Sequence, residues 1–367
     1  MKNTLNDKKQ IWIIAYAFAP NKRVGALRAS YWYKHIPEII NADVTVFTAE
    51  EQAKGPNINV VTKSGTSIMS RLIQDEGVVW RSNLKKVFES QYFDRPDVII
   101  ITGGPFMHFS LTKWLKQRYQ TKVILDYRDP FAVNPGFDNS GLKVMIKRFF
   151  EKRFNREADA LVTVNDYCGK LVEFFDTKPN AIVQNGYDES VEVNCTNPVL
   201  DSNLNLVYAG KFYFDPAPIQ KAVEESECRL TYIGPDEQQF HLSSKAIESK
   251  GFVPYPEAIR TIASADIGII QTYGHEFQST TKIFDYVRCG RVILIISNDK
   301  IEEGSIHDEL IHYPNVFWAK NDSESIKVAL DNIKKHEYLK PPANFGEKYS
   351  RKFQLTKLIE LLQEIGL

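Results

Sequence analysis

The sequence predicts an α/β protein with two domains, each containing a parallel sheet covered by helices. Short unbroken apolar runs alternate with amphipathic segments in both halves of the chain, as in parallel sheets buried on both faces. Residues 189–203 separate the halves, lack any periodicity and contain Asn, Thr, Pro and Ser. The 367 residues suffice for two ordinary domains. We therefore expect domains at 1–188 and 204–343, a linker at 189–203, and a terminal helix at 344–367.

The predicted elements of the first half begin with a strand, a loop and a helix. Further apolar runs and helical spacings follow in the order expected of βα units. The expected strands are 11–16, 44–47, 59–61, 97–101, 122–125 and 160–164, and the expected helices are 26–35, 66–90, 141–158 and one from 166.

The second half repeats this alternation after the linker. Its expected strands are 205–209, 229–234, 267–270 and 292–296, and its expected helices begin at 256 and 282. The last segment, 345–367, has Leu355, Leu358, Ile359 and Leu362 at helical spacing. Two such halves predict two Rossmann-like domains with a cleft between them.

The composition argues against several classes of protein: nucleic-acid-binding, membrane-spanning, zinc-binding and disulfide-rich proteins. A net charge of +0 gives no field that would attract nucleic acid. No apolar run approaches the roughly 20 residues needed to span a bilayer, and no signal peptide is predicted. The four cysteines lie apart in the sequence without a C-x-x-C pair, which suits a reducing cytoplasm and argues against a zinc site or a disulfide framework. We expect a cytoplasmic protein.

The stretch 278–288 has the chemistry of an anion site. A polar loop, Gln278 to Thr281, precedes a short helix, and the first helical residue is Lys282. Free backbone N–H groups and a lysine there favour a phosphate, and Asp285 one turn later could accept hydrogen bonds from the two hydroxyls of a ribose. The alternative is an ordinary capped helix with a solvated lysine.

Candidate residues in the first half lie at predicted strand ends. Gly25, in the loop after the first strand, would let the backbone approach a phosphate, although an ordinary βα turn has the same pattern. His108 follows the strand 97–101, where a neutral imidazole could bond a sugar hydroxyl, although a lone histidine is often structural. The segment Asp126 to Pro130 places two carboxylates and an arginine at another strand end, either orienting an acceptor hydroxyl or pairing with one another.

The segment 141–158 predicts a strongly basic helix. Six cations between Lys143 and Arg156 are interleaved with apolar side chains. Such a helix could dock on anionic lipid headgroups and bring the protein to a lipid-linked acceptor at the inner face of the membrane. It could equally be a core-packed helix with a solvated basic face.

Several of these segments resemble GT-B glycosyltransferases, in particular the large retaining glycosyltransferase family 4 of bacterial polysaccharide and lipid-glycan transferases. The segment 279–286, followed by Cys and Gly, resembles its donor-site motif. The residues 16–28 resemble its N-terminal loop, and 126–130 its D-x-R-D-P segment. The N-G-x-D at 185–188 and the Gly-Lys at 210–211 are also similar. The resemblance covers nearly the whole chain through degenerate motifs in matching order.

The resemblance implies a GT-B fold whose C-terminal helix crosses back to the first domain. It implies metal-independent transfer, with retention of configuration, of a sugar (of hexosyl type) from a nucleotide-diphosphate sugar to a glycan or lipid-linked saccharide in cell-surface polysaccharide synthesis. No cofactor and no nucleic acid are expected. The implied donor-binding residues are Gly25, Arg28, Asn185, Lys211, Thr280, Thr281, Lys282 and Asp285. The implied catalytic residues are His108, Asp129 and Glu276.

The sequence departs from the family pattern in the second half. Asp285 stands at the second, ribose-binding carboxylate, whereas Glu276 is one residue too far away for the first. Asp215 to Pro218 occupies the place of a second phosphate-binding Lys-Gly, and Arg28 could be a salt-bridged helix residue instead of a phosphate contact. A non-catalytic GT-B subunit that binds a partner, or a GT-B-fold epimerase or hydrolase, remains an alternative.

Overall fold

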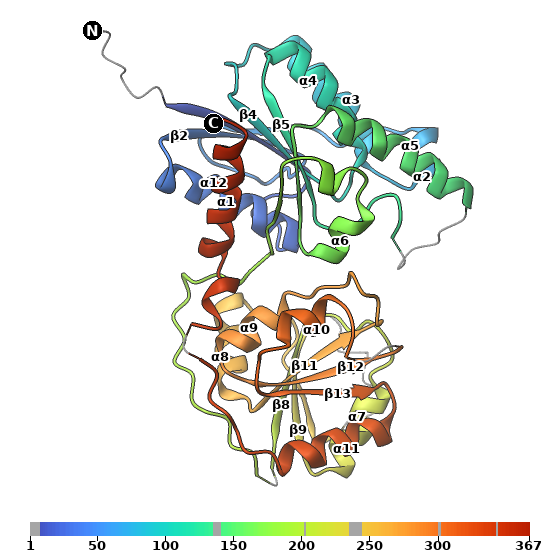
Figure 1. Ribbon diagram of the computed structural model, residues 1–367. Helices are drawn as coiled ribbons and strands as arrows, with labels where there is room; N and C mark the ends of the chain where they lie inside the picture. The colour runs from blue at the N-terminus through green and yellow to red at the C-terminus, as the bar shows by residue number, and fades with distance from the viewer. Residues whose placement is uncertain (1–7, 135–140, 202, 235–243, 300–301, 343) are drawn as a thin grey trace. The chain divides into compact units, whose positions relative to one another are not determined.

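The computed structural model describes residues 8–134, 141–201, 203–234, 244–299, 302–342 and 344–367 (Figure 1). The chain divides into two compact units. Unit 1 comprises Met1–Asn185 and Gln354–Leu367, and unit 2 comprises Gly186–Phe353.

The described part of unit 1 contains a seven-stranded parallel sheet in the order β3-β2-β1-β4-β5-β6-β7. Its strands are β1 (Lys9–Ala15), β2 (Ala42–Thr48), β3 (Ile58–Val60), β4 (Val98–Thr102), β5 (Lys122–Tyr127), β6 (Ala160–Thr163) and β7 (Asn180–Ile182). Its helices are α1 (Val24–Ile39), α2 (Ile68–Ile73), α3 (Gly77–Ser90), η1 (Met107–Leu111), α4 (Thr112–Tyr119), α5 (Gly141–Glu157), α6 (Asp166–Leu171), η2 (Phe175–Thr177) and most of α12 (Arg351–Glu364).

Both faces of the unit 1 sheet are buried, because alternate side chains of each strand point in opposite directions. Trp12 and Ile14 of β1 belong to the cluster that packs against α3 and α4. Ile11 and Ile13 belong to the other cluster, which packs against α1 and α12. Leu355, Leu358 and Leu362 of α12 belong to this second cluster. The last helix therefore completes the core of unit 1.

The described part of unit 2 contains a six-stranded parallel sheet in the order β10-β9-β8-β11-β12-β13. Its strands are β8 (Asn205–Ala209), β9 (Arg229–Ile233), β10 (Ile247–Ser249), β11 (Ile267–Thr272), β12 (Val292–Ser297) and β13 (Val316–Lys320). The helices α7 (Ala217–Glu225) and α11 (Ser323–Lys334) cover one face, and α8 (Tyr255–Ser264), α9 (Lys282–Arg288) and α10 (Ser305–Leu310) cover the other. A short helix, η4 (Glu347–Tyr349), precedes α12.

Residues 189–203, expected to form the interdomain linker, contact other residues of unit 2 where they are described. The Arg288 guanidinium donates to the carbonyl of Val191. The buried Arg291 guanidinium donates to the carbonyl of Thr196. The chain passes between the units at Asn185 and again within α12, so the attached segment is not the boundary itself.

The segment 66–90, expected to be helical with loops at unassigned positions, contains two helices, α2 and α3. Gln74 ends α2 in the left-handed conformation, with φ of 58°. The buried Asp75 carboxylate then accepts hydrogen bonds from the N–H groups of Gly77, Phe106 and Met107. The break therefore places a carboxylate where three backbone donors need an acceptor.

Candidate functional site

The strand order of each unit creates a crevice at the carboxyl edge of its sheet. In unit 1, β1 lies between β2 and β4, and in unit 2, β8 lies between β9 and β11. Loops that leave two such neighbouring strands run in opposite directions, and ligands of open α/β sheets bind in the gap between them. Gly25 and Gly103 follow the two strands of the unit 1 crevice. Lys211 and Lys282 follow those of unit 2.

Lys282, the first residue of α9, is the central cation of the unit 2 crevice. Its Nζ lies 5.0 Å from the ring centre of Tyr208 and 5.2 Å from that of Tyr213. Burial lowers the pKa of this amine to about 8. None of the described carboxylates forms an ion pair with it. A desolvated amine held only by aromatic rings retains its capacity to bind an anion.

Gly210 makes room for this amine. The residue follows β8 and has a φ of +120°, which side chains rarely adopt. A Cβ at this position would stand 3.0 Å from Cε and 3.3 Å from Nζ of Lys282. Lys211 comes next, is exposed, and likewise has no ion pair within the described part of the chain. Lys282 from α9 and Lys211 from the loop after β8 are therefore both cations at or next to the end of β8, and neither has an ion pair with a described carboxylate.

Gln271 is a site residue that the sequence analysis missed. It is the fifth residue of β11 and is fully buried. Its Oε1 accepts a hydrogen bond from the N–H of Tyr213 at 2.9 Å, and its Nε2 has no acceptor among the described residues. A buried amide donor without an acceptor is costly and suggests a ligand oxygen nearby. The only sequence signal was a polar residue closing an apolar run.

Asp285 lies one turn into α9 and accepts a hydrogen bond from the hydroxyl of Tyr255 at 2.7 Å. Burial raises the pKa of its carboxyl to about 6, and the hydrogen bond and the nearby cations Arg351 and Arg288 oppose this rise. Its two oxygens are therefore not equivalent, because one is occupied by Tyr255. Its predicted contact with a ribose stays a prediction.

The loop before α9 has a different construction from the one expected. Thr281 stands at the N-cap position in helical conformation, and no side chain caps the helix. Thr280 is buried. Gln278 organises the loop instead, because its Oε1 accepts from the hydroxyl of Thr272 and from the N–H of Tyr273. Both threonines stay predicted donor contacts.

Glu276 is exposed at the start of this loop. Its carbonyl accepts the N–H of Ser305 at 2.7 Å, and Gly304 lies so close that a Cβ there would stand 2.7 Å from Cα of Glu276. The backbone of Glu276 is thus fixed against the start of α10. Its predicted catalytic role stays a prediction.

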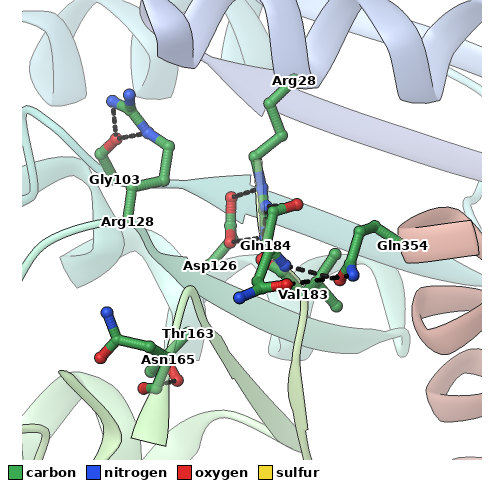
Figure 2. Close-up of polar contacts among 9 residues, drawn as sticks. All are labelled: Arg28, Gly103, Asp126, Arg128, Thr163, Asn165, Val183, Gln184 and Gln354. Atoms are coloured by element: carbon green, nitrogen blue, oxygen red, sulfur yellow. Dashed lines mark hydrogen bonds and ion pairs between the residues drawn. The ribbon is translucent and has the colours of Figure 1, made fainter. Parts of the chain in front are cut away.

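Arg28 is a salt-bridged helix residue in the structure (Figure 2). Its Nη2 lies 2.8 Å from Oδ1 of Asp126, and its Nε lies 3.2 Å from Oδ2. Its Nη1 donates to the carbonyls of Val183 and Gln184 at 2.6 and 3.1 Å. Both Arg28 and Asp126 are buried. Because all three guanidinium nitrogens are engaged, the structure corrects the predicted phosphate contact to a structural role.

Arg128 replaces Arg28 as the available cation of the unit 1 crevice. Its Nε and Nη2 donate to the carbonyl of Gly103 at 3.0 and 2.5 Å (Figure 2). Its Nη1 lies in the space that a Cβ on Gly25 would fill. None of the described carboxylates forms an ion pair with it. Gly25 therefore gives room to a guanidinium, where the sequence analysis expected a phosphate against its backbone.

His108 has a different environment from the one predicted. Its side chain is fully buried, 4.9 Å from the ring of Trp80, and its Nε2 lies 3.0 Å from the carbonyl oxygen of Thr102. Burial lowers the pKa of the imidazole to about 3, so the ring is neutral at pH 7. Because it has no exposed surface, the structure favours packing over the predicted contact with an acceptor.

The remaining two predicted residues lie in unit 1. Asp129 is exposed beside Arg128, one residue beyond it in the loop after β5. Asn185 is half-buried at the last residue of the first segment of unit 1. Asp129 is therefore accessible to an acceptor, and the roles of both residues stay predictions.

Unit 1 also has a polar cavity of about 440 Å³ next to the ends of β1 and β2. The Tyr16 hydroxyl donates to Oε2 of Glu76 at 2.7 Å within it. Arg23 and Lys63 line it without an ion pair to any described carboxylate. The other lining residues are Ala17, Asn21, Ala49, Glu50, Gly65, Ser70 and Val79. Its volume and lining suit a small polar ligand such as a sugar.

The described residues contain neither a metal-binding group nor a membrane-spanning helix. No group of three or more His, Cys, Asp or Glu side chains there is positioned to hold a metal ion. No helix in the described ranges has the length and hydropathy needed to cross a membrane.

Several solved structures have the same arrangement of helices and strands over nearly the whole length of this chain. The catalytic domain of starch synthase IV from Arabidopsis thaliana, bound to ADP and acarbose, is 11% identical over 97% of this chain and 99% of that chain, with a TM-score of 0.61. HepE from Anabaena in complex with UDP is 11% identical over 97% and 100%, with a TM-score of 0.64. The apo lipopolysaccharide outer core galactosyltransferase WaaB is 9% identical over 97% and 99%, with a TM-score of 0.63.

The sequence itself matches no family model and no curated protein. At about one identical residue in ten, the structural likeness shows the fold alone. The chain has the GT-B fold, with two parallel-sheet α/β domains, as the motif resemblance predicted.

Proposed function

We propose that this protein transfers a sugar from a nucleotide-diphosphate sugar to a hydroxyl of a saccharide acceptor. The observation that carries the proposal is the amine of Lys282, which lies beside Gly210 at the end of β8, with Lys211 as the next residue of the chain; neither lysine has a described carboxylate partner. Starch synthase IV and HepE have the same fold and contain ADP and UDP. Nucleoside diphosphate is the product that a glycosyl transfer leaves behind.

The two lysines act on the leaving group. Departure of the diphosphate builds negative charge on its oxygens, and cations already in place stabilise that charge without reorganising. The lowered pKa of Lys282 contributes, because a diphosphate beside the amine restores full protonation and gains a desolvated ion pair. Gln271 Nε2 supplies a further donor for a phosphate or sugar oxygen.

The nucleoside end of the donor is assigned to the segment around Asp285. The carboxylate oxygen that does not accept from Tyr255 binds the ribose hydroxyls in this proposal. Such a contact would position the donor so that its diphosphate reaches the two lysines. It would also favour a ribonucleotide over its 2′-deoxy analogue.

The acceptor is assigned to the cavity of unit 1. Sugar hydroxyls need paired donors and acceptors, and the Tyr16–Glu76 pair provides both. Arg23 and Lys63 add cations that suit an acceptor bearing a phosphate or a carboxylate. Asp129, exposed in the loop after β5, remains our proposed residue for positioning the attacking hydroxyl.

The finer features of the reaction rest on the motif resemblance. We include in the proposal a hexosyl donor, retention of configuration, independence from metal ions and a role in cell-surface polysaccharide synthesis. The lysines provide the charge stabilisation that a metal ion supplies in other transferases.

The first test measures thermal shift with UDP-glucose, GDP-mannose and ADP-glucose, followed by release of free nucleotide in the presence of octyl glycosides. We expect one nucleotide family to raise the melting temperature by mass action, and Lys211→Met to reduce the shift. Lys221→Met on α7, an exposed lysine paired with Glu225, is the matched control. Nucleotide release without an acceptor would instead indicate a hydrolase or an epimerase-like enzyme. Absence of any shift would overturn the proposal.

A further inference from the structure

The exposed surface of α2 and α5 is unusual for the outside of a domain. The two helices pack against each other, although 67 residues of sequence lie between Ile73, the last residue of α2, and Gly141, the first residue of α5. Figure 1 shows them side by side. Six large apolar side chains on them are exposed: Ile68 (87%), Met69 (43%), Leu72 (50%), Leu142 (69%), Met145 (69%) and Phe149 (62%). We call these residues, with the exposed cations of both helices, the α2–α5 face.

The core does not need these side chains. Helix α5 buries Glu151, Phe154 and Asn155, and partly buries Ile146 and Phe150 against the sheet cluster. The apolar residues on its opposite side repeat at positions 142, 145 and 149, which lie on one helical stripe. A contiguous exposed apolar surface of this kind marks an interaction site.

The cations of the α2–α5 face share its orientation. Arg148, Lys152, Arg153 and Arg156 are exposed on α5, and Arg71 is exposed on α2. The two carboxylates of α5 are turned away, because Glu151 is buried and Glu157 is half-buried and paired with Lys113 at 3.5 Å. Lys152 also pairs with Glu173 of another segment at 3.6 Å, so the exposed surface of α5 is apolar toward its N-terminal end and carries mainly Arg148, Arg153 and Arg156 toward its C-terminal end.

We propose that the α2–α5 face docks on the surface of an anionic lipid bilayer. Apolar side chains on the same surface as cations fit the headgroup boundary, where the side chains enter the acyl region and the cations meet lipid phosphates. Charge complementarity selects this occupant: the surface is cationic although the whole chain has a net charge of +0. Docking would hold unit 1 next to acceptors carried on lipids.

This inference goes beyond the transfer reaction and does not depend on it, because binding to vesicles is measured without donor or acceptor. Its failure would leave the assignment of Lys211 and Lys282 untouched.

The test is co-sedimentation of the full chain with phosphatidylcholine vesicles, with and without phosphatidylglycerol. We expect binding only to the anionic vesicles, weakened by salt. Arg148→Gln/Arg153→Gln should weaken it by about 30-fold, since each cation near the surface contributes roughly fivefold. Met145→Ser/Phe149→Ser should weaken it by a similar factor through lost apolar contact.

Matched controls separate this face from general surface properties. Lys34→Gln/Lys54→Gln removes two exposed cations of unit 1 elsewhere, and Val328→Ser removes an exposed apolar side chain of α11. Both should bind like the wild type, and all variants should keep its melting temperature. Equal binding to neutral vesicles, no binding to anionic vesicles, or binding unaffected by both α5 variants would each overturn the proposal. In the second case a protein partner would be the occupant to seek.

Discussion

Replacing Lys282 with methionine should stabilise the protein while it abolishes tight nucleotide binding. Methionine keeps most of the length and apolar surface of the side chain but removes the charge. In the native state that charge is desolvated and has no described carboxylate beside it. The residue therefore lowers the stability of the free protein, as expected where a binding site is kept ready for a ligand.

The magnitude follows from the pKa of the amine. A fall from 10.5 to about 8 corresponds to roughly 3 kcal/mol of native-state penalty when the amine is protonated. The cation–π contacts to Tyr208 and Tyr213 return about 1–2 kcal/mol in total. The net gain for Lys282→Met at pH 7 is then about 1–2 kcal/mol. For a unit of this size that raises the melting temperature by a few degrees.

The pH dependence of the free energy of unfolding shows whether the desolvated amine of Lys282 causes the difference between wild type and variant. The unfolded chain binds more protons than the native state between pH 8 and 10.5, so this lysine makes wild-type stability rise with pH in that window. The advantage of Lys282→Met should therefore be largest below pH 8 and vanish by about pH 10.5. Chemical denaturation of wild type and variant at matched pH values measures this difference directly.

Nucleotide binding gives the second readout. Losing a hydrogen bond to a charged group costs about 1.5–3 kcal/mol, so the dissociation constant for the stabilising nucleotide should rise roughly 10- to 100-fold. Isothermal calorimetry measures it, with Lys221→Met as the control that keeps wild-type affinity. A variant that melts lower than wild type and binds nucleotide normally would refute the reasoning, because Lys282 would then be a structural residue.

Three further predictions concern other groups. Wild-type nucleotide affinity should be constant between about pH 7, where the Asp285 carboxyl is ionised, and pH 8, and fall by up to about tenfold per pH unit above pH 8 as Lys282 loses its proton, and a flat calorimetric profile from pH 8 to pH 10 would contradict this. Arg28→Met should lower the free energy of unfolding by about 3–5 kcal/mol in urea titrations because it leaves Asp126 buried and unpaired, and a loss below about 1 kcal/mol would contradict the assigned pair. Gly25→Ala should displace the Arg128 guanidinium and slow turnover about tenfold with little change in melting temperature, and Arg128→Lys should match it; normal turnover in both would exclude Arg128 from the site.

The sequence predicted those features of the fold and site that follow from the order of neighbouring residues. The apolar runs 97–101 and 292–296 correspond to β4 and β12, because strands buried on both faces need little else to be recognised. Lys282 was selected because it begins a helix after a polar loop, and Lys211 because of the motif resemblance; their contacts with a donor stay predictions. Neither lysine forms an ion pair with a described carboxylate.

The sequence failed where a partner comes from a distant segment. The burial of His108 depends on Trp80 of α3, and no spacing between the two residues indicates their contact. Gln271 gave no signal because a single polar residue at the end of an apolar run is also an ordinary strand terminus. The apolar surface of α5 was assigned to the core or to a membrane without knowledge of α2, whose Ile68 extends it.

The two central strands of the protein have a common construction that separates its functional cations from its structural ones. Gly210 directly follows β8, whereas Gly25 is the second residue of α1, after the loop that leaves β1, and in each case the missing Cβ leaves room for a cation from a later segment, Lys282 or Arg128. These cations contact carbonyl oxygens or aromatic rings, which leave the positive charge unneutralised. Arg28, by contrast, faces a carboxylate and is neutralised. Burying an uncompensated cation such as Lys282 costs free energy in the absence of a ligand, which favours the proposed binding of an anion beside it.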